Sequence, residues 1–137
     1  MVRIPHNLMA YFAKIDENGT VVQTTSIADS LAPTEEAGQV FLNKLHRSDD
    51  TWVQFWKTTL AEGNPRKRGA SVGFVYDSVR NAFIEEPGPN FPSWTLDETD
   101  CVYKAPTPSP APLAVGDGTF RPYHWNEATQ TWDLAPL

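Results

Sequence analysis

The sequence has few of the residues that build disulfides and metal sites. It contains one cysteine, Cys101, and three histidines among 137 residues. A single cysteine forms no intrachain disulfide and cannot supply a zinc site with several cysteine ligands. The histidines, at positions 6, 46 and 124, are too far apart for a His-x-x-x-His motif. We therefore expect no disulfide framework, no metal site and no cofactor.

Positive charge and long apolar runs are also scarce. The chain has 17 acidic and 11 basic residues, for a net charge of −6. This charge repels phosphate backbones and argues against nucleic acid as the main partner. No apolar run approaches the ~20 residues of a membrane-spanning helix, and no signal segment precedes the first predicted strand. We expect neither direct nucleic-acid binding nor membrane insertion, and a reducing compartment suits the chain.

Aromatic residues and proline, in contrast, are abundant. Aromatics make up 12% of the chain and include five Trp, and there are 12 Pro. The length suits one compact domain with an ordered extension. With so many large rings, much of the buried surface must come from a few side chains.

The N-terminal half predicts a hairpin followed by a helix. Residues 1–8 read as an arm, and residues 9–86 as a β-rich domain. Asn18-Gly19 separates two β-branched or aromatic runs, which is a strong hairpin signal because both residues tolerate positive φ. Acidic residues open a helix predicted at about 34–47. Its apolar stripe at helical spacing would consist of Ala37, Val40, Phe41 and Leu45.

A strand and a basic loop follow the predicted helix. The segment Thr51–Lys57 has the pattern of a strand with bulky residues on both faces. The segment Glu62–Gly69 contains Arg66-Lys67-Arg68, which is the only basic cluster, and we interpret it as a surface loop. Three positive charges on an acidic chain favour a solvated loop or an acidic partner over nucleic acid.

The C-terminal half contains an internal repeat. In each copy an Asp or Asn follows a bulky residue, and an aromatic residue comes six positions after the Asp or Asn. A proline closes each unit three or four residues later. The copies are Tyr76-Asp77 with Phe83 and Pro87, Leu96-Asp97 with Tyr103 and Pro106, and Trp125-Asn126 with Trp132 and Pro136. An Asx side chain caps a turn and the bulky residues can meet across two strands, so each copy predicts a β-hairpin.

Proline-rich segments lie between these predicted hairpins. The segment Pro106–Pro112 has proline at every other position and should form a stiff, polyproline-II-like spacer. We predict a hairpin within proline-rich straps at residues 87–112. A C-terminal aromatic hairpin at residues 113–137 would be a separate unit, with its strands from about Thr119 onward. The fold class is then mainly β (α+β): a small antiparallel sheet with one packed helix, plus proline-linked hairpins.

No catalytic motif emerges from the sequence. A glycosidase needs two carboxyl groups across a cleft, one with a raised pKa. The pairs Asp49-Asp50 and Glu85-Glu86, like Asp97 and its acidic neighbours, fall at predicted turns or strand ends and would be solvated. Cys101 lies among acidic residues, which favours a packed or half-buried thiol over a reactive one. We predict that the protein is not an enzyme.

The residues that we expect to bind a partner are aromatic and basic. Trp and Tyr dominate the hot spots of protein interfaces, so protein contact is the favoured interpretation for the aromatics. The predicted binding residues are Trp94, Tyr123, Trp125 and Trp132, together with Arg66, Lys67 and Arg68. Alternatively, Tyr123, Trp125 and Trp132 form a flat platform for sugar rings, with Trp125 and Trp132 near each other across the turn. Coplanar, exposed rings would favour that alternative, and rings buried against protein would exclude it.

The segment Met9–Asp16, with the sequence MAYFAKID, resembles the opening of a family of small proteins from marine tailed bacteriophages, especially those of cyanobacteria. The resemblance covers most of the chain after Met9. It continues at residues 73–77, 82–84, 92–98 and 123–127. It implies a virion component and transfers no catalytic residues. Residues 1–8 precede the usual starting methionine, and the segment Pro106–Pro112 is longer and richer in proline than the family pattern.

Together these observations predict a virion structural protein made in the host cytoplasm. It would decorate the capsid or join the tail or neck, binding neighbouring virion subunits as a homo-oligomer or in many copies. One alternative is a carbohydrate-binding module of a tail fibre that contacts host glycans. Another is a small early phage protein that inhibits a host enzyme.

Overall fold

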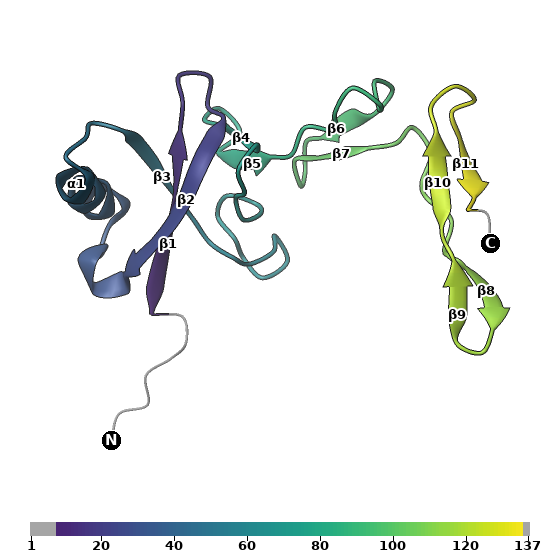
Figure 1. Ribbon diagram of the computed structural model, residues 1–137, viewed down its shortest axis with the longest axis horizontal. Coiled ribbons are helices and arrows are strands. Elements are labelled where there is room, and N and C mark those ends of the chain that lie inside the picture. The colour runs from purple at the N-terminus through teal and green to yellow at the C-terminus, as the bar shows by residue number, and fades with distance from the viewer. Residues whose placement is uncertain (1–7, 136–137) are drawn as a thin grey trace. The chain divides into compact units, whose positions relative to one another are not determined.

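The structure is a computed structural model that describes residues 8–135. The chain divides into two compact units, Met1–Glu85 and Glu86–Leu137, called unit 1 and unit 2 below (Figure 1). The fold is mainly β, with small antiparallel sheets and one α-helix, which confirms the predicted class. Apart from Leu8, the predicted arm lies outside the described residues, as does Pro136 of the third repeat.

The sheet of unit 1 has three strands. They are β1 (Met9–Ile15), β2 (Val21–Ala28) and β3 (Thr51–Phe55), in the order β2-β1-β3. Both outer strands are antiparallel to β1 and therefore run in the same direction as each other. The connection between them must pass over β1, and it contains the 3₁₀ turn η1 (Asp29–Leu31) and the helix α1 (Glu35–His46).

The turn between β1 and β2 confirms the predicted hairpin but differs in detail. The Oδ1 atom of Asp16 accepts the backbone N–H groups of Asn18 and Thr20, each at 2.9 Å. Gly19 has φ +83°, whereas Asn18 is not among the described residues with positive φ. A side chain at Gly19 would also approach the carbonyl oxygen of Tyr76 to 2.8 Å. Only the glycine of the Asn-Gly pair therefore needs the left-handed conformation.

Helix α1 confirms the predicted helix at about 34–47, but its apolar stripe was placed wrongly. Thr34 caps the helix by accepting the Ala37 N–H at 3.1 Å. Val40 and Leu45, assigned to the stripe, are 63% and 61% exposed. The buried positions are Gly38 and Leu42, with Phe41 partly buried.

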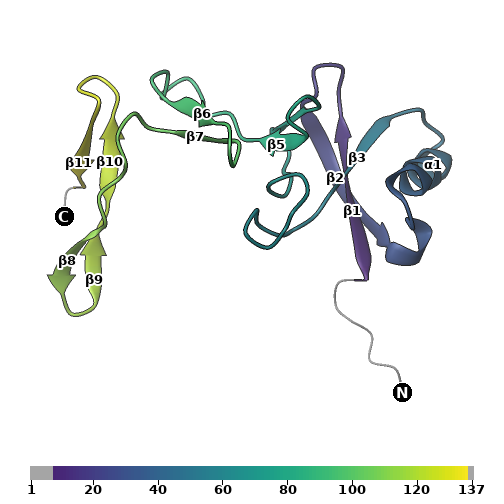
Figure 2. The ribbon, with the colours of Figure 1, turned by 180° about the vertical axis from the view of Figure 1, so that it is seen from behind.

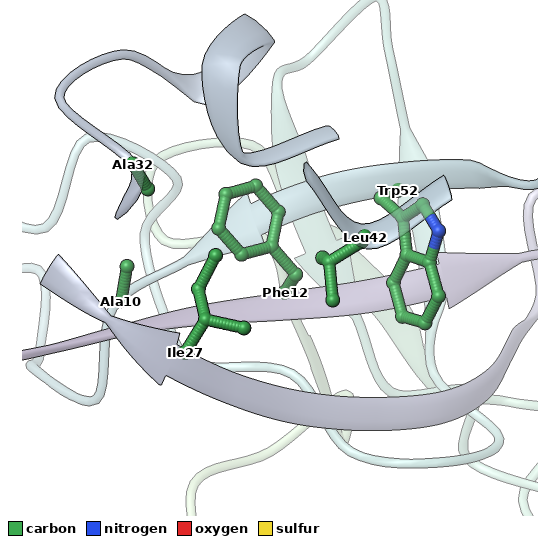
Figure 3. Close-up of a cluster of buried hydrophobic side chains, with 6 residues drawn as sticks. All are labelled: Ala10, Phe12, Ile27, Ala32, Leu42 and Trp52. Carbon is green, nitrogen blue, oxygen red and sulfur yellow. The ribbon is translucent and has the colours of Figure 1, made fainter. Parts of the chain in front are cut away.

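Gly38 determines which face of α1 meets the sheet. A Cβ atom at this position would lie 2.8 Å from Cε2 of Phe12 and still closer to its Cζ. The absent side chain therefore admits the Phe12 ring. Figure 3 shows the resulting core on the helix side of the sheet, which consists of Ala10, Phe12, Ile27, Ala32, Leu42 and Trp52.

A second core lies on the opposite face of the same sheet. Its buried residues are Ala13, Val21, Val53, Phe55 and Phe83. Phe83 belongs to the first repeat, which forms the hairpin β4 (Val75–Asp77) and β5 (Ala82–Ile84). Strand β3 thus presents bulky residues to both cores, as predicted, although it ends at Phe55 rather than at Lys57.

Three further two-stranded sheets form unit 2 (Figure 2). They pair β6 (Thr95–Asp97) with β7 (Val102–Lys104), β8 (Leu113–Gly116) with β9 (Thr119–Arg121), and β10 (Tyr123–Asn126) with β11 (Thr131–Leu134). No helix in the described part of the chain is long and apolar enough to cross a membrane.

The three repeats fold into the same hairpin, as the sequence predicts. The bulky residue and the later aromatic residue face each other across the strands as Tyr76–Phe83, Leu96–Tyr103 and Trp125–Trp132. The Asx Oδ1 atom accepts backbone N–H groups of the turn in each copy, at 2.8–3.2 Å. The residue before each second strand has positive φ, at Asn81, Cys101 and Gln130. All three hairpins therefore have a four-residue turn whose last residue is in the left-handed conformation.

The hairpin β8–β9 is not part of the repeat and was not predicted. Its turn is Asp117-Gly118, and both turn residues as well as Gly116, the last residue of β8, have positive φ. The Asp117-Gly118 pair is a hairpin signal of the same kind as Asn18-Gly19. The predicted strands of the last unit began at about Thr119, and no strand was assigned to residues 113–118, where β8 lies.

Candidate interaction surface

Three tryptophans from two hairpins of unit 2 form one cluster. Trp94 precedes β6, while Trp125 and Trp132 face each other in β10–β11. The ring centroids are 6.2 Å apart for Trp94–Trp125, 6.2 Å for Trp94–Trp132 and 5.3 Å for Trp125–Trp132. Phe91 extends the cluster, 5.0 Å from Trp94. All four side chains are half-buried. The sequence had placed Trp94 and the last hairpin in separate units, whereas these contacts join them.

Glu127 connects the two hairpins through polar contacts. Its carboxylate accepts the backbone N–H of Ser93 at 2.9 Å and the Ser93 hydroxyl at 2.8 Å. It also accepts the indole N–H of Trp125 at 2.5 Å. The Trp125 hydrogen bond contributes most to a pKa of Glu127 below its usual value, and together with the bonds from Ser93 it outweighs the opposing effect of burial. The ionised carboxylate therefore fixes the tryptophan cluster at its edge.

The proline-rich segment also contacts the cluster. The indole N–H of Trp132 donates to the carbonyl oxygen of Thr107 at 2.9 Å, between Pro106 and Pro108. The indole nitrogen of Trp94 is fully buried and has no hydrogen-bond partner among the described residues. The spacer is thus held against the hairpin that it was expected only to carry.

The ring geometry gives no support to a flat sugar-binding platform. The planes of Trp125 and Trp132 make an angle of 63°, and those of Trp94 and Trp125 an angle of 81°. Such edge-to-face arrangements are favoured when aromatic rings pack on one another. A platform for stacking sugars would require coplanar, exposed faces, and these rings instead cover each other. Tyr123, the remaining aromatic of the predicted set, faces Leu134 across β10–β11 and is half-buried.

The largest exposed apolar side chains of unit 2 lie on β8–β9. Phe120 is 62% exposed, Val115 46% and Leu113 43%, and all four residues of β8 are exposed. Exposed hydrophobic residues gathered on one element are typical of interaction sites. Sequence reasoning missed these residues, although the alternation of apolar residues around Asp117-Gly118 would have indicated them.

The basic cluster is not a simple solvated loop. Asn64 is 4% exposed and anchors the loop by donating to the carbonyl oxygens of Trp56 and Thr58, at 2.9 and 2.8 Å. Lys67 has φ +76° in this loop. Arg68 pairs with Glu85 at 3.4 Å and lies over the ring of Phe74.

Arg66 contacts several elements of unit 1. Its guanidinium donates to the Glu35 carboxylate at 2.5 and 3.0 Å, to the Gln54 carbonyl at 2.5 Å and to Asn81 at 2.9 Å. It also lies 5.3 Å from the Tyr76 ring centroid. Arg66 therefore joins helix α1, strand β3 and hairpin β4–β5, and its side chain is only 13% exposed.

The chemically reactive residues are dispersed in the structure. Cys101 is a buried free thiol, 1% exposed, as the sequence predicts. His46 stacks on Trp52, and His124 is exposed. Within residues 8–135, no group of three or more His, Cys, Asp or Glu side chains is placed to hold a metal ion.

Of the predicted binding residues, the structure brings together Trp94, Trp125 and Trp132, and the basic residues lie in unit 1. Comparison of the chain with protein-family models, with curated proteins and with solved structures gives no match.

Proposed function

We propose that the chain is a non-enzymatic structural protein that binds neighbouring subunits of a phage particle, at the capsid, the tail or the neck. One observation carries this proposal: unit 2 has almost no buried core. Among residues 86–135, only Cys101 and Ala135 are buried. Isolated two-stranded hairpins are at best marginally stable in water. The surface of a partner protein supplies the burial that unit 2 lacks.

The contacts within unit 2 suit this role. The tryptophan cluster and Glu127 hold two hairpins and the proline-rich segment together. The hairpin β8–β9 then offers Phe120 on one face and Leu113 on the other to the partner, because Phe120 pairs with Ala114 and Leu113 with Arg121. Several hairpins on one chain bind multivalently, so contacts that are weak singly add through a high effective concentration.

The phage setting rests on the resemblance of the sequence. The segments that carry the resemblance contain strand β1, both strands of the first repeat hairpin, and the first strands β6 and β10 of the other two, so they lie in both units of the chain. The repeat is therefore part of the resembling pattern rather than an addition to it.

Quantitative mass spectrometry of purified, DNA-filled particles tests the location. We expect the chain to be present at a fixed copy number. Abundance near that of the major capsid protein indicates capsid decoration, and a few copies indicate the tail or neck. Absence from the particles would contradict the virion role and favour the inhibitor of a host enzyme.

A substitution in β8–β9 tests the proposed surface. Phe120→Asp places a charge in the apolar hairpin, so we expect fewer copies per particle. Val79→Asp is the matched control, because Val79 is 94% exposed in the turn of β4–β5. Equal incorporation of both variants would argue against β8–β9 as the contact.

A further inference from the structure

The two edges of the unit 1 sheet are protected very differently. On β3, side chains occupy the outward backbone groups. The Trp52 carbonyl accepts from Gln39 at 2.7 Å, and the Gln54 N–H donates to Glu35 at 2.7 Å. The Gln54 carbonyl accepts from Arg66 at 2.5 Å. No further strand can pair with this edge without displacing these contacts.

The outer edge of β2 is open along most of its length. Its first residue, Val21, bonds to residues 73 and 74. Beyond Val21, every second residue of β2 hydrogen-bonds to β1. The bond from the Asp29 N–H to the Leu8 carbonyl oxygen sets this alternation, so Ile27, Thr25 and Gln23 face β1. This alternation turns the backbone groups of Thr24, Ser26 and Ala28 away from β1. All three residues are exposed, and within residues 8–135 their outward groups have no hydrogen-bond partner.

The composition of this edge favours strand pairing. The segment Val22–Ala28 contains no charged residue, no proline and no glycine, in a chain of net charge −6. Edge strands of monomeric proteins are usually protected by charges, proline, bulges or shortness. Strand β2, with eight residues, is longer than any other strand of the described chain, and its bulge lies at the already covered end. The open part of β2 therefore lacks these protective devices.

We propose that β2 pairs antiparallel with β2 of a second copy of this chain, which joins the two three-stranded sheets into one. Only outward-facing residues can bond, so a twofold axis at Ser26 places Thr24 opposite Ala28 of the other copy. In this register every outward group of the three residues has a partner.

The side chains near the seam are compatible with this register. Asp29 of one copy faces Gln23 of the other, so no carboxylate opposes a carboxylate. Val22, 46% exposed, faces the turn Asp29–Leu31 of the other copy, where Leu31 is 40% exposed. The pairing thus covers apolar surface at both ends of the seam. It uses unit 1 alone and is independent of the surface proposed on unit 2.

Sedimentation equilibrium of the full chain over a range of concentrations tests the proposal. We expect the mass to rise from 15.3 kDa to twice that value. Ser26→Lys places two like charges on the axis, so we expect at least about tenfold weaker dimerisation, because like charges directly opposite each other are destabilising. Val79→Lys, with the same charge at an exposed turn, should dimerise like the unmodified chain.

A second variant guards against a simple folding defect. Thr24→Pro removes an N–H that points away from β1, so it should prevent dimerisation and leave the internal ladder intact. Hydrogen exchange should show the amides of Thr24 and Ser26 slowed in the unmodified chain. Both amides should exchange fast in Ser26→Lys, and the Ser26 amide should exchange fast in Thr24→Pro, which has no amide at position 24. A mass of 15.3 kDa at every concentration would overturn the proposal. A dimer that persists in both edge variants would overturn it equally.

Discussion

At the scale of single residues, the ion pair of Arg66 with Glu35 is the contact that connects most elements. Burial alone would raise the pKa of Glu35. The hydrogen bonds from Arg66 and from the Gln54 N–H, with the positive charge of Arg66, outweigh burial and lower the pKa below its usual 4.5. The same carboxylate raises the pKa of Arg66 against the opposing effect of burial. The charged pair is thus favoured in the folded state.

Replacing Glu35 by Gln should lower the free energy of unfolding at neutral pH and make that free energy less dependent on pH in the acid range. Because the folded-state pKa of Glu35 is depressed, its contribution is present above about pH 4.5 and is lost as the pH falls through the folded value. We expect a loss of about 1–3 kcal/mol at neutral pH, as for hydrogen bonds to charged groups. Urea titrations across pH measure it, with Glu36→Gln, at an exposed neighbour, as the control. Identical acid profiles for Glu35→Gln and the unmodified chain would contradict this account.

The sequence could not predict this pair. Arg66 and Glu35 are 31 positions apart, and both are residue types that usually lie on the solvated surface. Only the crossover that places α1 beside β3 brings them together. The sequence-based interpretation therefore grouped Arg66, Lys67 and Arg68 as one basic cluster, although their roles in the fold differ. Arg66 pairs with Glu35, whereas Arg68 pairs with Glu85.

At the scale of elements, the contact between α1 and the sheet depends on Gly38. Alanine is a better helix former than glycine by about 1 kcal/mol. The added methyl group would nevertheless collide with the Phe12 ring and lie 3.1 Å from the Cβ atom of Ala32. We expect Gly38→Ala to destabilise unit 1 by about 1–3 kcal/mol, as overpacking does. Thermal denaturation checks this, with the exposed site Val40→Ala as the control. A Gly38→Ala variant more stable than the unmodified chain would contradict this account, because it would show that the Phe12 ring can shift to accommodate the methyl group.

Periodicity predicted the existence and bounds of α1 but not its buried face. Val40 and Leu45 are apolar and yet exposed, because the sheet meets the helix at Gly38 and Leu42. A glycine carries no hydrophobic signal, so a pattern of apolar residues cannot reveal a contact that depends on a missing side chain.

The repeat hairpins depend on one left-handed residue each. Gln130 has φ +53° and is exposed, and non-glycine residues in this conformation are strained by about 1–2 kcal/mol. Gln130→Gly should relieve part of this strain and stabilise β10–β11 by about 1 kcal/mol. The near-ultraviolet circular dichroism of the tryptophan cluster at one low temperature measures it, because its intensity follows the folded fraction of the hairpin. Thr129→Gly, at a neighbouring turn residue that is not in this conformation, is the control and should destabilise.

The repeat spacing predicted its hairpins well because their cause is local. The Asx cap, the turn and the facing aromatic pair all lie within seven positions of one another. The grouping of Trp94 with Trp125 and Trp132 is a contact between hairpins, and no local pattern encodes it.

At the scale of the whole molecule, the two units differ in the burial that supports them. Unit 1 has cores on both faces of its sheet, whereas the described part of unit 2 buries only Cys101 and Ala135. We expect residues 1–85 alone to unfold cooperatively on heating, and residues 86–137 alone to show no cooperative transition. Circular dichroism of the two fragments measures this difference. A cooperative transition in the isolated second fragment would contradict it.

Hydrogen exchange, compared between the free chain and the chain in purified particles, tests the central claim most directly. We predict that the amides of β1 are protected in both states, because they lie inside a three-stranded sheet. The amides of residues 86–135 should exchange rapidly in the free chain and slowly in the particle, where a partner covers them. Equal protection of unit 2 in the two states would show that it is stable by itself, and would contradict its role as a segment that binds neighbouring subunits.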